Sequence, residues 1–454
     1  MKTLKRITIL FSIAIVWSTA VASAPIMRVI EVGPDITTAE SPSIAVSAIN
    51  NASQVVGTIS TPYGPRGFIW HNGEMTTMGY LSPVLTDPFS IVIPYPLPIP
   101  YSRAHNINDS GQVVGVSGWL GDEVFLWENG QMSHLSGIEP VHVIGLDDRL
   151  GVAAINNVGQ VVGRYYRDVY PNEDIPCFLW QNGVVVELDR PGVWPSAIND
   201  SGVVVGTISP SGGAFLWEDG VFTDMGPSFW TASDVNNLRQ VVGMAQDEAY
   251  IWEGGSIIRL GHLGSYTSWA GAINDNSQVV GTSFTSSWES HAFIWQDGVM
   301  TDLNSLIPAD CGWVLAYAKD INESGDIIGH GFYKGESRPF LCKTFDSYIS
   351  IDVKPGDSSN TINLKSNGML PVAVLASSDC PIDSIDVGTI SLAGAKPARQ
   401  TRQDVDGDGD EDLLFHFRIP ELNLNATSVE ANLIGRFSDG RWLVGSDKVK
   451  IAGR

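Results

Sequence analysis

The sequence predicts an all-β protein with two domains: a seven-bladed β-propeller over residues 25–343, followed by a β-sandwich over residues 346–454. Three observations predict this fold class. A motif of Ile-Asn, a turn and Val-Val-Gly recurs seven times, and after it ends apolar and polar residues alternate along the chain. The third is composition: 47 Gly and 25 Pro with only 17% charged residues is typical of short strands joined by turns.

Residues 1–24 are typical of a secretory signal peptide. Three basic residues among the first six precede an apolar run, Ile7 to Trp17, that is short for a membrane span. Small residues follow, so cleavage is expected after Ala22 or after Ala24. A retained N-terminal anchor is the alternative. The favoured prediction is a secreted, extracellular or periplasmic protein whose mature chain has no membrane span.

Each repeat has the same order of short strands. The first strand ends at the Ile-Asn pair, Val-Val-Gly forms the second, a Phe-Leu-Trp stretch forms the third, and a stretch such as Val299 to Asn304 forms the fourth. The repeated tryptophans are interpreted as packing between blades: Trp70, Trp127, Trp180, Trp217, Trp252 and Trp295. The repeated asparagines are interpreted as turn residues that bond their own backbone: Asn50, Asn108, Asn156, Asn199, Asn236, Asn274 and Asn322.

Both ends of the repeat region favour closure into a ring. The seventh repeat ends at Cys342 without a fourth strand, and the segment Met27 to Gly33 resembles the strand that is missing. We therefore expect this N-terminal segment to complete the last blade. An open β-solenoid with separate caps is the alternative, because repeats alone do not determine closure.

The repeats resemble the HAF-type extracellular repeat family, named for a His-Ala-Phe tripeptide. That tripeptide is His291-Ala292-Phe293, between INDNSQVVG and IWQDGVMTDLNSL. The resemblance covers roughly residues 25 to 343. It implies an extracellular repeat architecture, and it carries no catalytic residues or ligand to this chain.

Function is expected where the repeats differ, on one rigid face. In five repeats an aromatic residue precedes the Ile-Asn or Val-Asn pair by four to eight positions: Tyr101, Trp194, Trp230, Trp269 and Trp313. We predict that these side chains form an aromatic rim near the central channel that binds an extracellular carbohydrate or protein. The alternative is that they fill gaps between blades.

A binding role is favoured over catalysis because the sequence has no nucleophile elbow, zinc-protease motif or phosphate-binding loop. An enzyme, such as a polysaccharide lyase or glycoside hydrolase with its site on the channel face, is one alternative. A structural surface or matrix protein is another. The formal charge of −23 excludes nucleic acid as the expected partner. We expect a monomer.

The C-terminal domain resembles a module of secreted microbial proteins, through IDVKPG, LPVAVLAS and DVDGDGDEDLLFHF. Its last motif holds five alternating aspartates: Asp404, Asp406, Asp408, Asp410 and Asp412. With Asp404 as position 1, carboxylates fall at positions 1, 3, 5 and 9 of an EF-hand loop and Gly409 at position 6, but position 12 is Phe415. A calcium site that makes the loop rigid is predicted, with a solvated acidic turn as the alternative.

Four cysteines complete the sequence-based predictions. Cys311 and Cys342 belong to the same repeat and are the expected disulfide pair in an oxidising compartment. Cys177 and Cys380 lie in different predicted domains, so we expect them to be free and buried.

Overall fold

The computed structural model describes residues 27–33, 42–81, 99–118, 122–138, 151–164, 177–188, 192–208, 212–226, 228–309, 311–378 and 380–452. The regular elements in these ranges are β-strands apart from three short 3-10 helices, η1 (Leu303–Ser305), η2 (Ile382–Ser384) and η3 (Ile419–Glu421). The all-β class is therefore confirmed. The predicted signal peptide and its cleavage positions lie outside the described residues. Within them, no helix is long and apolar enough to cross a membrane.

Each repeat forms one antiparallel sheet of four strands, paired in chain order in six of the repeats. The first three are β2 (Ile44–Ile49), β3 (Val55–Thr61), β4 (Gly64–His71), β5 (Glu74–Thr77); β6 (Tyr101–Ile107), β7 (Val113–Gly118), β8 (Asp122–Glu128), β9 (Gln131–His134); and β10 (Gly151–Ile155), β11 (Val161–Arg164), β12 (Cys177–Gln181), β13 (Val184–Leu188). The next three are β14 (Val193–Ile198), β15 (Val204–Ile208), β16 (Ala214–Glu218), β17 (Val221–Asp224); β18 (Phe229–Val235), β19 (Val241–Ala245), β20 (Glu248–Glu253), β21 (Ser256–Arg259); and β22 (Gly264–Ile273), β23 (Val279–Thr285), β24 (Ser290–Gln296), β25 (Val299–Asp302).

The seventh sheet combines the two ends of the repeat region. It contains β26 (Trp313–Ile321), β27 (Ile327–Tyr333) and β28 (Glu336–Thr344), and its fourth strand is β1 (Met27–Glu31). Strand β1 pairs antiparallel with β28, from Met27 opposite Thr344 to Glu31 opposite Phe340. The N-terminal segment therefore supplies the strand that the seventh repeat lacks, as the sequence predicts.

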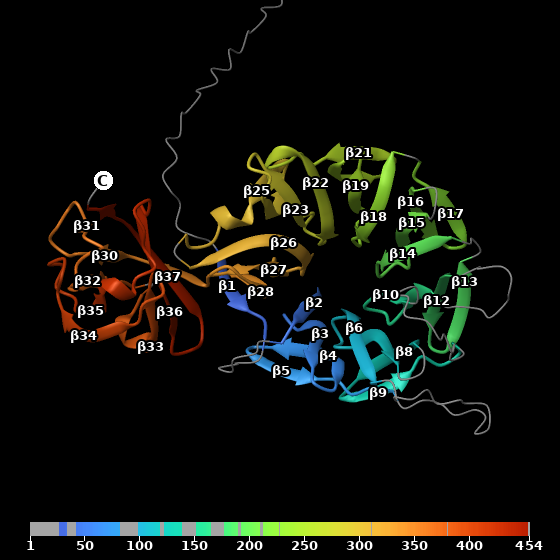
Figure 1. Ribbon diagram of the computed structural model, residues 1–454, viewed down its shortest axis with the longest axis horizontal. Helices are drawn as coiled ribbons and strands as arrows, with labels where there is room; N and C mark the ends of the chain where they lie inside the picture. Colours follow the sequence, from blue (N-terminus) through green and yellow to red (C-terminus); the bar gives the residue numbers. More distant parts are fainter. Residues whose placement is uncertain are drawn as a thin grey trace, which may run out of the picture.

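The sheets lie side by side around a common centre, with the first strand of each unit innermost (Figure 1). This is the arrangement of a β-propeller. Apolar side chains fill the space between neighbouring sheets; for example, Val56 of the first unit packs with Ile107 and Phe125 of the second. The repeated tryptophans serve this packing, since Trp70, Trp180 and Trp295 are all buried.

The repeated asparagines link the units in a circle that we call the asparagine belt. Each Asn bonds its own turn, and its Nδ2 also donates to the carbonyl oxygen of the equivalent Asn in the next unit. The seven inter-unit bonds run from Asn50 to Asn108, Asn156, Asn199, Asn236, Asn274, Asn322 and back to Asn50, with N···O distances of 2.9–3.1 Å. The turn role predicted from sequence is thus only half of what these residues do.

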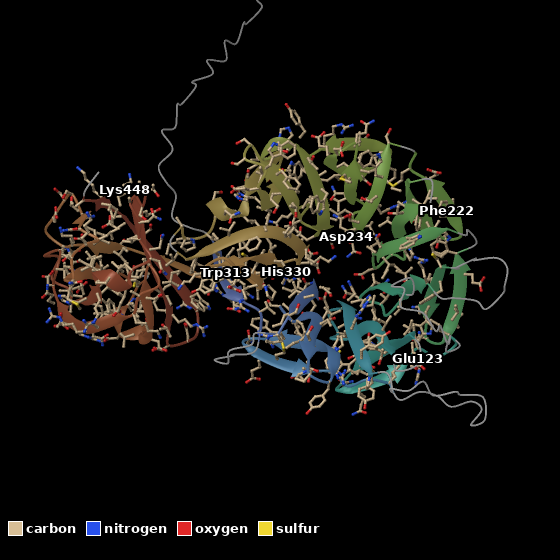
Figure 2. The ribbon with its side chains drawn as sticks, viewed as in Figure 1. Glu123, Phe222, Asp234, Trp313, His330 and Lys448 are labelled. Atoms are coloured by element: carbon tan, nitrogen blue, oxygen red, sulfur yellow. The ribbon has the colours of Figure 1, made fainter. Side chains whose placement is uncertain are left out.

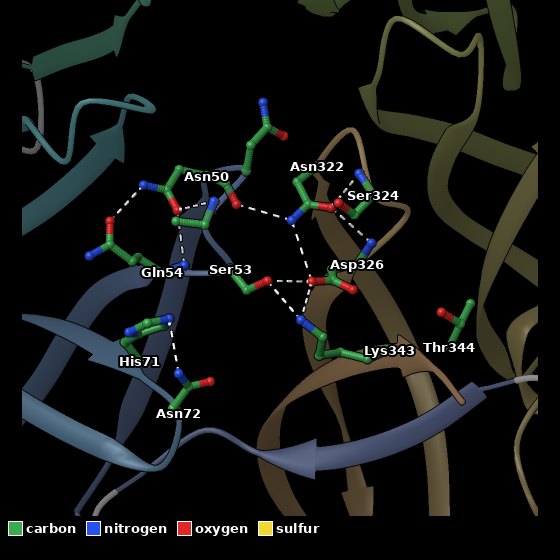
Figure 3. A network of polar contacts seen from close by, with 12 residues as sticks. Asn50, Ser53, Gln54, His71, Asn72, Asn322, Ser324, Asp326, Lys343 and Thr344 are labelled. Carbon is green, nitrogen blue, oxygen red and sulfur yellow. Dashed lines mark hydrogen bonds and ion pairs between the residues drawn. The ribbon is translucent and has the colours of Figure 1, made fainter. Parts of the chain in front are cut away.

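The junction between the seventh and first units has an additional ion pair (Figure 3). Asp326 stands where five other units have glutamine, and it is buried. The Nζ of Lys343 donates to Asp326 Oδ2 at 2.6 Å and to Ser53 Oγ at 2.7 Å, and Ser53 Oγ donates to the same carboxylate oxygen. This network joins the last unit to the first with both charges paired.

The C-terminal domain contains two four-stranded sheets that share one hydrophobic core. The first sheet has the order β29 (Ser347–Ile349), β37 (Trp442–Lys448), β36 (Glu430–Phe437), β33 (Ile385–Leu392). The second has the order β30 (Ile351–Val353), β32 (Met369–Val374), β35 (Asp412–Arg418), β34 (Pro397–Gln403), and a small pair joins β31 (Thr361–Ile362) to β38 (Lys450–Ile451). Phe415 and Phe417 from one sheet and Leu433 and Phe437 from the other are buried in that core.

Arg28 of β1 connects this domain to the propeller. Its guanidinium bonds the carbonyl oxygen of Thr344, lies 3.9 Å from the Asp346 carboxylate and 4.8 Å from the centre of the Trp442 ring. Burial lowers the pKa of Arg28 to about 10, and Asp346 opposes that shift. The N-terminal strand therefore contacts both halves of the molecule.

Candidate functional site: the inner strands

The innermost strands carry two rows of side chains around the centre of the propeller. The first row is defined by position: each member stands four residues before the Ile or Val of the Ile-Asn or Val-Asn pair. On the neighbouring strand it pairs with the residue that directly follows the glycine of Val-Val-Gly. We call this set the aromatic row, after its largest members: Ala45, Arg103, Gly151, Trp194, Thr231, Trp269 and Tyr317. The carbonyl oxygen of the row residue lies directly over that glycine, so a Cβ on Gly281 would stand 2.1 Å from the oxygen of Trp269.

The second row lies two residues further along each inner strand. Its members are the extra residues of a β-bulge that recurs in all seven units, because the pairing register shifts by one residue at each of them. We call this set the polar row: Ser47, His105, Ala153, Ser196, Ser233, Gly271 and Lys319. None of the seven is buried, whereas most residues on either side of them are. The bulges therefore turn these positions toward solvent at the centre.

Only two of the five predicted aromatic residues lie in the aromatic row. Trp194 and Trp269 belong to the aromatic row. Tyr101 and Trp230 stand six and five positions before the Ile or Val, and Trp230 is the extra residue of a separate bulge. Trp313 stands eight positions before and packs in its own unit, with ring centres 5.3 Å from Tyr333 and 6.3 Å from the buried Phe340 (Figure 2). The five side chains do not share one register, since Tyr101 and Trp313 pair at other positions of their strands and Trp230 lies in a bulge.

The three aromatic side chains of the aromatic row are exposed or partly exposed. Trp194 is 43% exposed, and the Arg164 guanidinium lies 3.9 Å from its ring centre. Trp269 lies between Phe284 and Tyr317, with ring centres 6.4 and 6.3 Å away. Tyr317 is also 43% exposed. The sequence analysis missed Tyr317, although its spacing of four residues, shared with Trp194 and Trp269, is a signal that could have identified it.

Two carboxylates lie below the polar row, at the interfaces between units. Asp234 and Asp320 each accept the backbone N–H of the residue that follows them, and each also accepts an N–H of the next unit, from Ile273 and Ile49 at 2.9 Å. Burial raises the pKa of Asp234 to about 6. Burial and the nearby Asp234 charge raise the pKa of Asp320 to about 7, while Lys319 opposes both shifts.

His330 is a further titratable group near Lys319. Its Nε2 accepts the Val46 N–H at 3.4 Å, which links the seventh unit to the first. Burial and the Lys319 charge lower the pKa of His330. Figure 2 shows both His330 and Asp234 toward the centre of the propeller. Among the described residues, the centre therefore combines aromatic side chains with Lys319 and two partly buried carboxylates.

The opposite end of the centre is closed by a second circle of polar groups. A cavity of about 160 Å³ lies there, lined by the Ile-Asn-Asx turns of all seven units. The backbone N–H of each residue after the belt Asn donates to the side chain of its counterpart in the next unit, as from Asn51 to Asp109 at 2.8 Å. Because these carboxylate and amide oxygens already accept hydrogen bonds from the next unit, a structural role accounts for the circle.

The acidic loop of the C-terminal domain brings together three of its five predicted ligands. Carboxylate oxygens of Asp404, Asp406 and Asp412 lie within 4.8 Å of one another. Two oxygens on opposite sides of a calcium ion at about 2.4 Å are separated by a similar distance. Asp412 is 1% exposed and accepts the N–H groups of Ala376 and Val405, both at 2.8 Å, so it fixes the base of the loop.

The other two aspartates lie outside this close group. The Oδ1 of Asp408 accepts the backbone N–H of Asp410 at 2.9 Å, and Asp408 in turn donates its N–H to Asp406. Asp404 accepts the N–H groups of Gly407 and Gly409, which have positive φ angles. The glycines thus permit the sharp turn expected of a cation-binding loop.

The cysteines lie in the environments expected from the sequence. Cys342 is buried in the hydrophobic cluster of the seventh unit, and Cys311 packs against the same cluster. Burial raises the pKa of Cys342, and the proximity of Cys311 adds to this shift. The described residues contain no disulfide bond, so the pairing of Cys311 with Cys342 stays a prediction. Cys177 and Cys380 are both buried and free.

The fold and the inner-strand rows define a β-propeller protein with a solvent-facing centre. No family model and no curated protein matches the chain. Among solved structures, it is similar to the β-propeller domain of the Trilobed protease from Pyrococcus furiosus, with 12% identity, a TM-score of 0.44, and coverage of 67% of this chain and 98% of that one.

Two further structures show a comparable degree of likeness. The acylaminoacyl peptidase of Pyrococcus horikoshii is 11% identical with a TM-score of 0.41, and the match covers 74% of this chain and 58% of the peptidase. The chain thus spans little more than half the length of that enzyme. YCF48 bound to D1 peptide is 10% identical with a TM-score of 0.37, over 71% of this chain and 100% of that one. These distant likenesses assign no function.

Proposed function

We propose that the chain is a secreted or cell-surface binding protein, with a closed seven-bladed propeller and a C-terminal β-sandwich. Its ligand is an extracellular carbohydrate that contacts the aromatic row. The observation that carries the proposal is the exposure of Trp194 and Tyr317 at one register, with Trp269 packed beside Tyr317. Exposed aromatic faces stack on sugar rings, and the asparagine belt holds the strands that present them rigidly in place.

A panel of immobilised oligosaccharides tests this proposal. The changes Trp194→Ala and Trp269→Ala should each weaken binding about tenfold, since a stacking pair contributes on the order of 1 kcal/mol or more. Trp230→Ala is the matched control: its side chain is 41% exposed but lies at another register. If Trp230→Ala abolished binding and Trp269→Ala left it unchanged, the aromatic row would not be the site.

The hydrogen bonds of the central carboxylates favour a binding function over the enzymatic alternative. The acids nearest the aromatic row, Asp234 and Asp320, each hold two backbone N–H groups and join neighbouring units. Carboxylates used in this way are positioned for structure. An extracellular protein remains the second candidate ligand, because exposed tryptophan and tyrosine also anchor protein interfaces.

Export of the chain is part of the proposal, and the N-terminus of the purified mature protein tests it. Sequencing should find Ser23 or Pro25 as the first residue, corresponding to cleavage after Ala22 or Ala24. A chain recovered from the cell with Met1 intact would contradict export through a cleaved signal.

We also propose that Asp404, Asp406 and Asp412 hold a calcium ion that makes their loop rigid. Calcium at a hundredfold excess over its dissociation constant should raise the unfolding free energy of the domain by about 3 kcal/mol. Asp404→Asn should abolish this gain, whereas Glu421→Gln, an exposed acid elsewhere in the domain, should not. Calorimetry without calcium binding, and unfolding insensitive to EDTA, would contradict the proposal.

A further inference from the structure

We propose that the saccharide bound at the centre is anionic, with uronate carboxylates, and that Lys319 binds one of them. This inference rests on the proposed function and names the ligand class. Its starting point is the charge of the two rows. The chain carries a net charge of −23, yet the two rows include Arg103, His105 and Lys319 and contain no acid. The side chains of the two rows are therefore basic where they are charged, whereas the carboxylates of Asp234 and Asp320 lie near Lys319 between the units.

Lys319 is the basic residue best placed for an anion. It is exposed at a bulge of β26, and within the described ranges its ammonium makes no ion pair or hydrogen bond. The nearest carboxylates, Asp320 and Asp234, already accept two backbone N–H groups each. An ammonium has three N–H donors, and in this position all three are available to a ligand.

The row residues next to Lys319 are small. Its neighbours in the polar row are Gly271 and Ser47, and the adjacent member of the aromatic row in the first unit is Ala45. Gly271 is closely packed, because a Cβ there would lie 3.2 Å from the Ala318 oxygen and 3.3 Å from that of Lys319. Two blades further on, Arg103 adds a second positive charge, and its guanidinium lies 5.6 Å from the centre of the Tyr101 ring.

The aromatic and basic groups fit one sugar unit. Tyr317 precedes Lys319 by two residues, which corresponds to about 6.5 Å along a strand. A pyranose ring stacked against Tyr317 and Trp269 would thus bring its carboxylate within reach of the flexible Lys319 side chain. The binding is a charge-assisted hydrogen bond, so no covalent step is involved.

The remaining row members favour a saccharide over an acidic peptide. Ser47, Ser196, Ser233 and Thr231 provide hydroxyl groups that suit the many hydroxyls of a sugar. Outside the three aromatic residues, the rows contain no apolar side chain larger than alanine. A peptide would find few pockets for apolar side chains there.

Calorimetric titration of the mature full-length protein tests the inference, with tetragalacturonate and its fully methyl-esterified form as probes. The wild type should bind the acid about tenfold more tightly than the ester, the scale expected of one charge-assisted contact. Lys319→Ala should remove this preference, Lys319→Arg should retain most of it, and Lys365→Ala, an exposed lysine of the C-terminal domain, should have no effect.

The outcomes separate the two proposals. If the wild type bound tetragalacturonate and its methyl ester equally, or if Lys319→Ala kept the preference for the acid, the proposal of an anionic ligand would be overturned. Carbohydrate binding itself would still be tested by Trp269→Ala. If the protein bound a polyglutamate peptide through Lys319 and bound neither saccharide, the proposal that the ligand is a saccharide would be overturned. If Trp194→Ala and Trp269→Ala bound every probe as the wild type does, the proposed function itself would fail.

Discussion

The glycine that ends each Val-Val-Gly stretch is required by a single steric contact. A Cβ at Gly57, Gly206, Gly281 or Gly329 would lie 1.9–2.1 Å from a carbonyl oxygen of the inner strand. The bulge that follows brings this carbonyl inward, so the space for a side chain is absent in every unit where it is described. The repeated glycine and the solvent-facing polar row thus have the same origin.

Replacing Gly281 by Ala should therefore lower the unfolding free energy by about 3 kcal/mol, because the inner strand must move away. Gly79→Ala is the control: no atom lies within 4 Å of a Cβ built there. Urea unfolding of both variants measures the difference. Equal stability of Gly281→Ala and the wild type would show that the strand accommodates the methyl group freely.

The sheets are joined to one another by short, directional bonds, and the junction of the last and first units differs from the others. In five of the other units a glutamine such as Gln54 or Gln278 bonds the belt asparagine of its own turn. At the closing junction Asp326 takes this place and pairs with Lys343. A buried ion pair is costly to break from one side, because the remaining charge is left without a partner.

Lys343→Met should consequently destabilise the protein by about 3 kcal/mol. Asp326→Gln introduces the residue found at this position in five other units, so the double variant Asp326→Gln/Lys343→Met should recover most of the loss. Thermal and urea unfolding of the two single variants and the double variant form a cycle that measures the coupling. Additive losses in the double variant would contradict an energetic role for the pair.

The strands and turns of the propeller could be predicted from the sequence because each repeat has the same order of strand-forming and turn-forming residues. The match of Met27–Glu31 to the missing strand was also visible in the pattern. The aromatic set was only partly predictable, since a bulge shifts the register at Lys319 and its equivalents without a residue type that marks it. In the acidic loop, alternate spacing identified five aspartates, but only Asp404, Asp406 and Asp412 lie close together, because the folding of the loop on itself is not visible in the spacing.

At the scale of the whole molecule, the centre of the propeller makes stability depend on pH. Asp234 and Asp320 have pKa values raised by burial to about 6 and about 7, above the ordinary value of 3.8. The folded state therefore holds their protons at a pH where the unfolded chain has released them. Stability must fall as pH rises from about 4 to about 7, and change little through these groups above that.

Chemical unfolding across this pH range checks the prediction. The unfolding free energy should decrease by about 2 kcal/mol between pH 5 and pH 8, after allowance for water at the centre. Asp234→Asn/Asp320→Asn should remove this part of the dependence, and Asn106, which accepts the Ile155 N–H at the equivalent place, shows that the fold accepts an amide there. A pH profile identical to that of the wild type would refute the assignment.

The pairing of β1 with β28 also determines the order in which the protein can fold. Arg28 and Thr344, in contact across this sheet, are 316 residues apart. At synthesis rates of 5–20 residues per second, the first strand waits roughly 15–60 s before its partner is made. Six units can form during that interval, but the seventh cannot. The ring therefore closes only after the repeat region is complete, and a contact so distant in sequence makes closure the expected slow step of folding.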